Sequence, residues 1–237
     1  MSLAFLTPDT LGPGIAARSP MERLARAAGA RMQLREGWNI ATAYSDGGRE
    51  RLLLEERVGF ADRCDMVKLE LQAEPAALAG LTRVASGGQT LRPGRAVRSR
   101  GAWWCPVTPA RTLVLGEREE GPAIREAVAG AAEDLPATVT VTVTDLTCGL
   151  AALALAGPAA PELLARFCAI DVRPAVMPVG AFRPGSVART PGYVLRDGEQ
   201  RLLVLVGWAL GEYLWTVVAD AAEHLGGGPV GADALPD

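Results

Sequence analysis

The sequence contains a candidate internal repeat, in which short stretches from the first half recur in the same order in the second half. Four pairs of stretches match at offsets of 83 to 91 residues: 62–71 with 145–155, 92–94 with 183–185, 113–115 with 203–205, and 131–133 with 221–223. Any one match is unremarkable in a chain rich in Ala, Leu and Gly. Their shared order at a nearly constant offset favours duplication of a small module. The alternative is two unrelated α+β stretches of similar composition.

Hydrophobic periodicity predicts the same succession of elements in both halves. In the first half we expect strands at 66–73, 103–107, 111–116 and 137–144, with helices at 75–84 and 121–133. In the second half we expect strands at 150–155, 192–196 and 201–206, with helices at 160–168 and 210–225. Each half therefore reads β-α-β-β-α, and the first adds a closing strand, as in ferredoxin-like split βαβ units. The predicted fold class is α+β with two tandem ferredoxin-like halves.

The same reading sets provisional boundaries. The first half spans 19–145 and includes two further helices, one starting at Ser19-Pro20 and one at 49–57, with Gly37-Trp38 in a loop or short strand between them. The second half spans 146–226. Residues 1–18 are rich in Pro and Gly, and we expect an arm that lies on a neighbour or is disordered. Residues 227–237 are Gly-rich and acidic, and we expect a flexible tail.

Composition excludes several classes of function. A chain with 49% hydrophobic and 22% charged residues is typical of a soluble globular protein. The net charge of -3 and the lack of a basic stripe argue against nucleic-acid binding. No apolar run is long enough to span a membrane, and the N-terminal stretch lacks the charged region of a secretory signal. We therefore expect a cytoplasmic protein.

Cysteine and histidine usage gives little support for a metal site or a nucleophilic enzyme. The four cysteines, Cys64, Cys105, Cys148 and Cys168, form no CxxC pair, and His224 is the single histidine. Zinc or iron–sulfur binding is therefore not expected. Cys105 or Cys148 would need a neighbouring histidine to act as an activated nucleophile, and only His224 is available.

Two groups of short motifs resemble known families. The N-terminal third resembles the glycine cleavage system T-protein (aminomethyltransferase) through Ser19-Pro20, Gly29-Ala30-Arg31, Gly37-Trp38, Tyr44, Glu55-Glu56 and Val58-Gly59-Phe60-Ala61-Asp62. From Val143 onward the chain resembles the gamma subunit of heterotetrameric sarcosine oxidase. The motifs here are Thr144-Asp145-Leu146-Thr147, the Ala-Gly-Pro turn at 156–158, Leu163-Leu164, Asp171-Val172, Pro178-x-Gly180 and Glu212-Tyr213-Leu214-Trp215.

The resemblance implies the folate-binding fold of this superfamily, built from two intertwined ferredoxin-like halves. Its members bind tetrahydrofolate and move one-carbon units, or act as a small subunit beside a flavin amine oxidase. The resemblance therefore suggests tetrahydrofolate as a cofactor. It also suggests flavoprotein amine oxidase subunits, or a second copy of this chain, as partners.

One departure from the T-protein bears directly on function. The catalytic aspartate of the T-protein lies in an Asp-Asp-Leu run on a strand. The corresponding positions in this sequence, 101–105 and 190–194, carry no carboxylate. Aminomethyl transfer needs a carboxylate near the folate amine to hold or relay its proton. The chain also has no room for the third domain of the T-protein. We therefore expect an accessory subunit that lacks the transferase carboxylate.

The alternative is a stand-alone folate-dependent transferase, or an enzyme that reuses the cleft for other chemistry. Such an enzyme would need a deep pocket, and the binding candidates are Trp104 and Tyr193 for stacking on a pterin, Arg189 for a folate carboxylate, Asp171, and Glu212. Asp171 is also the one weak candidate for catalysis. Each has a structural alternative: capping or a solvated surface for the charged residues, and core packing for the aromatic ones. Asp62 and Asp145 are likewise either ligand contacts or turn caps. A third class, a purely structural interaction protein, would have a filled cleft.

Overall fold

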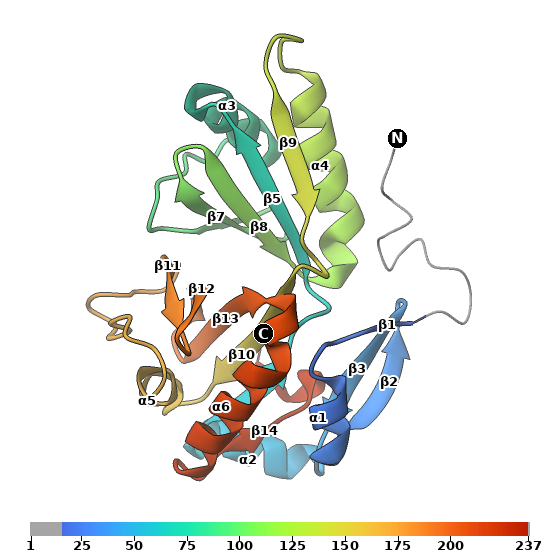
Figure 1. Ribbon diagram of the computed structural model, residues 1–237, viewed down its shortest axis with the longest axis vertical. Helices are drawn as coiled ribbons and strands as arrows, with labels where there is room; N and C mark the ends of the chain where they lie inside the picture. The colour runs from blue at the N-terminus through green and yellow to red at the C-terminus, as the bar shows by residue number, and fades with distance from the viewer. Residues whose placement is uncertain (1–15, 237) are drawn as a thin grey trace.

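Three β-sheets organise the computed structural model, which describes residues 16–236. Of the expected N-terminal arm, residues 1–15 lie outside the described residues. The last part of that arm forms strand β1 (Ala17–Arg18), which pairs in parallel with β3 (Trp38–Ala43). Two larger sheets, each with helices on one face, pack against each other and make up the bulk of the molecule (Figure 1).

The first large sheet is a ferredoxin-like unit. Its strand order is β6 (Val97–Ser99), β7 (Ala102–Thr108), β8 (Arg111–Gly116), β5 (Val67–Ala73) and β9 (Val141–Asp145). Helices α3 (Pro75–Ala85) and α4 (Gly121–Glu133) lie against one face of it (Figure 1). The chain follows β5-α3-β7-β8-α4-β9, and the spatial order β7-β8-β5-β9 is that of a split βαβ unit.

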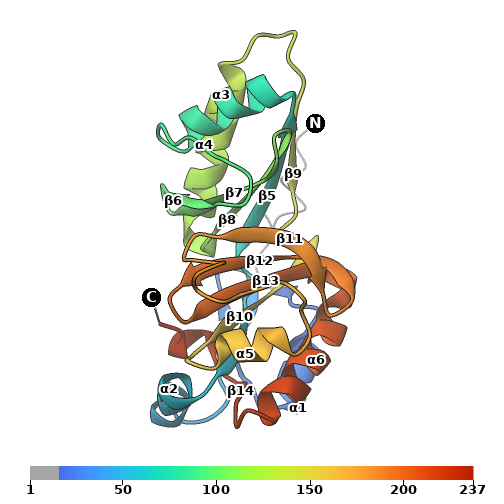
Figure 2. The ribbon, with the colours of Figure 1, turned by 90° about the vertical axis from the view of Figure 1, so that its left-hand side faces the viewer.

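The second large sheet repeats this plan with one change. Its order is β11 (Phe182–Val187), β12 (Thr190–Gly198), β13 (Arg201–Gly207), β10 (Leu150–Ala156), β4 (Gly59–Asp62) and β14 (Gly228–Pro229). Helices α5 (Ala160–Ala165) and α6 (Gly211–Glu223) cover one face, and the other face is turned towards the first unit (Figure 2). The position beside β10 is filled by β4, which comes from before the first unit.

The two short strands β4 and β9 are therefore exchanged between the units. Strand β4 precedes β5 in the chain but pairs with β10, whereas β9 precedes β10 but pairs with β5. The two strand pairings are equivalent in the internal repeat of the sequence. Leu69 lies opposite Asp145 in one unit, and Leu153, the counterpart of Leu69, lies opposite Asp62, the counterpart of Asp145, in the other. The halves are thus intertwined through a reciprocal strand exchange.

A small third sheet packs beside the second unit. It has the order β1-β3-β2, where β2 spans Arg31–Arg35, and it is flanked by helices α1 (Glu22–Ala27) and α2 (Gly47–Glu56). The Ser19 hydroxyl accepts a hydrogen bond from the backbone N–H of Met21, but α1 begins later than expected, with Met21 and not Ser19 at its N-cap position. Asp46 caps α2 by accepting from two backbone N–H groups. The indole of Trp38 is buried and meets Trp208 edge-on at 6.3 Å between ring centroids.

The segment after α6 is packed rather than loose, which differs from the flexible tail expected at 227–237. Strand β14 pairs in parallel with β4, Val230 is buried, and the backbone N–H of Gly231 donates to Glu50 Oε2 at 2.7 Å. A Cβ on Gly231 would lie 1.8 Å from the carbonyl oxygen of Thr42. The glycines here permit close approach of two backbones, and they do not mark a linker.

Other differences concern short strands. Strands β4, β6 and β11 lie where no strand was expected. The long helices and the central strands fall within a few residues of their predicted positions; α4 matches its predicted bounds. Among the described residues, none of the helices has both the length and the apolar character needed to cross a bilayer.

Candidate functional site

The two aromatic residues proposed for ligand stacking lie on different sheets. Trp104 is buried between its sheet and helices α3 and α4, and its Nε1–H donates to the Ser99 carbonyl at 3.1 Å. Tyr193 stacks on Phe182 with ring centroids 5.6 Å apart, and its hydroxyl accepts from Arg111 Nη2 at 3.0 Å. Both residues therefore have the packing roles that strand aromatics usually have.

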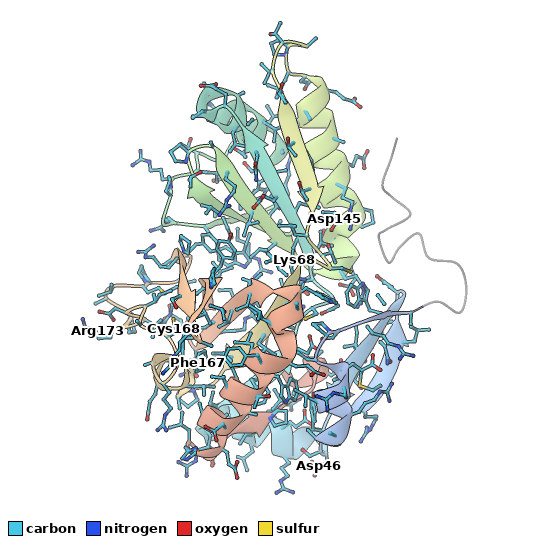
Figure 3. The ribbon with its side chains drawn as sticks, viewed as in Figure 1. Asp46, Lys68, Asp145, Phe167, Cys168 and Arg173 are labelled. Carbon is cyan, nitrogen blue, oxygen red and sulfur yellow. The ribbon has the colours of Figure 1, made fainter. Side chains whose placement is uncertain are left out.

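The charged candidates lie elsewhere on the surface. Asp171 accepts from the backbone N–H of Arg173, and its Oδ2 lies 2.6 Å from Arg173 Nη2. Arg173 is labelled in Figure 3. These hydrogen bonds lower the pKa of Asp171. Glu212 on α6 pairs with Arg23 at 2.8 Å, and Arg189 is exposed in the β11–β12 turn with φ of 63°.

The structure does not bring these five candidates together. Trp104 borders a hollow of about 400 Å³ on the helix side of its sheet, and Asp171, Arg189, Tyr193 and Glu212 do not line it. The deep pocket lined by Asp171, Tyr193 and Trp104, which the stand-alone enzyme would need, is not formed by this arrangement.

Asp62 and Asp145 are turn caps at equivalent positions. Asp62 Oδ1 accepts from the backbone N–H of Cys64 at 2.9 Å, and Asp145 Oδ1 accepts from that of Thr147 at 2.8 Å. Asp145 is labelled in Figure 3. Each cap turns the chain from an exchanged strand into the first strand of the next unit. Burial raises the pKa of Asp62, although its hydrogen bonds with Ser19 and Cys64 act in the opposite direction.

The two turns cross beside a fully buried lysine. The backbone N–H of Arg63 donates to the Ala152 carbonyl at 2.9 Å, and that of Leu146 donates to the Lys68 carbonyl at 2.7 Å. The Lys68 ammonium, labelled in Figure 3, donates to three backbone carbonyls: Cys64 at 2.9 Å, Met66 at 2.8 Å and Thr147 at 3.2 Å. Burial lowers the pKa of Lys68. Lys68 therefore ties together the two turns where the halves cross.

The interface between the two large sheets is filled by apolar side chains. They come from both units and form one core cluster of buried residues: Met66, Ala96, Cys105, Leu113, Leu115, Ala152, Ala154, Phe182, Leu195, Leu203 and Leu205. The cavity that remains at one end of this interface has a volume of about 20 Å³. That is room for about one water molecule, whereas pockets for organic ligands usually measure ~300 Å³ or more.

A charged groove opens next to this small cavity, where the three sheets and the C-terminal segment meet. We call it the junction groove; its volume is about 280 Å³, and its charged lining is Arg35, Arg63, Asp65, Arg98, Glu117, Arg118, Glu119, Arg201 and Asp233. The C-terminal segment closes one side, because Asp233 pairs with Arg35 at 2.7 Å and Arg201 donates to the Pro236 carbonyl.

Most charges in the junction groove are paired with one another. Arg63 contacts Glu117 and lies 3.6 Å from Asp65, and Arg118 lies 3.2 Å from Asp65 and also contacts Glu119. Burial disfavours the charge on Arg63, but the neighbouring carboxylates outweigh this and raise its pKa. Carboxylates are therefore present beside the interface between the halves, held by arginines.

Asp197 is a further carboxylate at this end of the interface. It lines the small cavity and pairs with Arg201 at 2.9 Å. Burial raises the pKa of Asp197 in spite of the opposing effect of Arg201. Asp197 stands in an Asp-Gly pair that indicates a hairpin turn and not a site, and none of the charged residues of the junction groove was a candidate from the sequence.

The cysteines and the histidine are not arranged as a catalytic pair. Cys64, Cys105 and Cys168 are buried and Cys148 is exposed, and all four are free. His224 lies at the end of α6, where its Nδ1 is 2.7 Å from the Asp220 carbonyl oxygen. Among the described residues, no group of His, Cys, Asp and Glu side chains is placed to hold a metal ion.

Comparison with protein families identifies the group to which this architecture belongs. The model of the sarcosine oxidase gamma subunit family matches residues 102–224, just over half of the chain. The chain belongs to the sarcosine oxidase gamma subunit family. No curated protein matches this gamma-family sequence.

Solved structures agree on the fold of this gamma-family chain. A glycine cleavage system aminomethyltransferase T from Bartonella henselae is 16% identical, with a TM-score of 0.74 over 92% of this chain. The match covers 60% of that protein, so the chain spans about three fifths of its length. A chain of the heterotetrameric sarcosine oxidase from Corynebacterium sp. U-96, solved with pyrrole 2-carboxylate, is 24% identical with a TM-score of 0.65. That match covers 93% of this chain and 98% of the other.

Proposed function

We propose that this chain is a non-catalytic accessory subunit of a flavin-dependent amine-oxidising complex. Its family membership supplies the class of complex, and the filled interface between the halves is the observation that supports an accessory role. A cytoplasmic location is part of the proposal, since free cysteines are usual there.

Tetrahydrofolate is the cofactor that the family resemblance suggests, and the residues present fit it poorly. The cavity between the halves is about 20 Å³, and the candidate side chains for a pterin and a folate carboxylate lie apart. The carboxylates nearest to that cavity, Asp197 and Glu117, are already engaged by Arg201 and Arg63. These features support a chain that does not bind folate between its halves.

Purification of the tagged, full-length chain from its source cells tests the subunit role. We expect a flavoprotein with amine oxidase activity to co-elute in stoichiometric amount and to stay bound through size exclusion. A chain that elutes alone, as a monomer or as a dimer, contradicts the proposal. An untagged culture processed in parallel controls for flavoproteins that bind the resin.

Calorimetric titration of the isolated chain with tetrahydrofolate separates the proposal from its rival. We expect no saturable heat at micromolar ligand. Micromolar binding would favour a stand-alone folate-dependent transferase, and Tyr193→Phe and Trp104→Phe would then show whether the residues named from sequence take part.

A further inference from the structure

The junction groove contains one arginine whose charge is not matched by a carboxylate. Arg98 lies on β6, is exposed, and lines both the groove and the small inner cavity. Its guanidinium carbon lies 5.9 Å from the centre of the Trp103 ring. Within residues 16–236 this ring is the one partner described for the Arg98 guanidinium, so its five N–H donors are available to a ligand.

The inner cavity presents a buried polar atom that lacks a hydrogen-bond partner. Asp197 Oδ1 belongs to a residue that lines the cavity, and no described residue donates a hydrogen bond to it. The Asp197 side chain is 10% exposed. Because a buried polar atom without a partner is costly, Asp197 Oδ1 indicates that a hydrogen-bond donor occupies this position.

The available groups define the chemistry of a ligand. An arginine fork binds a carboxylate with two parallel hydrogen bonds, and the Trp103 ring holds the fork of Arg98 in place. The acceptor Asp197 Oδ1 calls for an N–H or O–H donor, reached directly or through the one water that about 20 Å³ admits. The other groove arginines are already paired, so a ligand with several negative charges would meet no surplus of positive charge.

We propose that the junction groove is a binding site for a small monocarboxylate that also carries a hydrogen-bond donor. The carboxylate binds Arg98 in the groove, and the donor group satisfies Asp197 at the inner cavity. The groove volume of about 280 Å³ limits the ligand to a small metabolite. This site lies at the end of the filled interface, and it does not depend on the proposed subunit role.

Titration of the full-length chain with glycolate and acetate tests the proposal. Both probes carry one carboxylate, and only glycolate carries a hydroxyl donor. The readout is the indole N–H resonance of Trp103 in a nitrogen–proton NMR spectrum, assigned with Trp103→Phe. We expect saturable shifts at millimolar glycolate, at least fivefold weaker binding of acetate, and no saturation with inorganic phosphate.

Two arginine variants supply the matched comparison. Arg98→Gln should weaken glycolate binding at least tenfold, whereas Arg92→Gln, an exposed arginine in the loop before β6, should bind as the wild type does. Both positions are exposed, so both variants should fold, which the rest of the spectrum reports. Absence of saturable binding by wild type, equal binding by Arg98→Gln, equal affinity for acetate, or saturable phosphate binding would overturn the proposal.

Discussion

Lys68 is an unusual way to join two halves of a fold, because its partners are backbone carbonyls and not carboxylates. Removing the ammonium leaves the carbonyls of Cys64, Met66 and Thr147 without this donor. It also removes the cost of burying the charge, which is evident in the lowered pKa of Lys68. Since each orphaned carbonyl costs on the order of 1 kcal/mol or more, the loss should outweigh the relief.

Lys68→Met should therefore lower the free energy of unfolding by about 2 kcal/mol, measured by urea denaturation. Gln72→Met is the matched control, because Gln72 is exposed on the same strand and the same face. Equal stability of Lys68→Met and wild type would show that the three carbonyls find other donors.

One of the four thiols should react with a thiol reagent in the folded chain, and the other three should not. Only Cys148 is exposed, so a thiol reagent should label one cysteine in the folded chain and four after unfolding. Partial burial raises the pKa of Cys148, so its labelling rate should keep rising above pH 9. Cys148→Ser should abolish the fast phase; labelling of two or more thiols in the native chain would contradict the burial described.

Burial raises the pKa of Cys64 and Cys105 well above 9.0. The unfolded chain therefore loses these protons first as the pH rises. The stability that the two neutral thiols contribute is fully present below pH 9 and is lost above it. Cys105→Ala should reduce the fall in unfolding free energy between pH 8 and pH 10, as followed by urea denaturation at each pH. An unchanged slope would mean that other groups dominate.

At the scale of elements, the C-terminal segment is packed although its Gly-rich composition predicts a flexible tail. Gly231→Ala should displace the segment, because the new methyl group would collide with the Thr42 carbonyl and break the Gly231–Glu50 hydrogen bond. We expect rapid proteolytic clipping after α6. Gly228→Ala has open space around its Cβ position and should be clipped no faster than wild type. Resistance of Gly231→Ala to protease would show that the segment can shift and remain bound.

Elements with strong periodicity could be predicted from the sequence, and those that depend on distant partners could not. Helix α4 buries Ile124 and Val128 on one face, a spacing of four that is visible in the residues alone. The third residue predicted for this face, Ala132, is half-buried, and Ala131 is buried in its place. Strands β4 and β14 are short and gain their hydrogen bonds from each other and from β10. Nothing within the four residues of β4 indicates that they pair with β10, which lies far along the chain.

The candidate site was harder to predict for the same reason. Arg63, Arg98 and Arg201 belong to three separate stretches and meet only in the folded chain. Among 24 lysines and arginines, no local signal distinguishes them from surface charges. The aromatic and acidic residues chosen from family motifs are instead engaged in packing, capping and ion pairs.

At the scale of the whole molecule, the halves at 19–145 and 146–226 should not fold independently. Fragment 1–145 lacks both neighbours of β4, and the apolar cluster between the sheets draws on both fragments. Expressed alone, fragments 1–145 and 146–237 should lack a cooperative thermal transition, and mixing them during refolding should restore one. Cooperative unfolding of either fragment by itself would contradict this interdependence, and the intact chain serves as the control.

The reciprocal exchange of β4 and β9 also constrains how such a chain can originate. A polypeptide with a single copy of the repeated module would present one short strand for which its own sheet offers no place. In a twofold-symmetric dimer of two such polypeptides, the short strand of each copy would pair with the sheet of the other. Fusion of the two genes would then preserve these strand pairings. An obligate dimer of half-length chains is therefore the simplest ancestor that this topology allows.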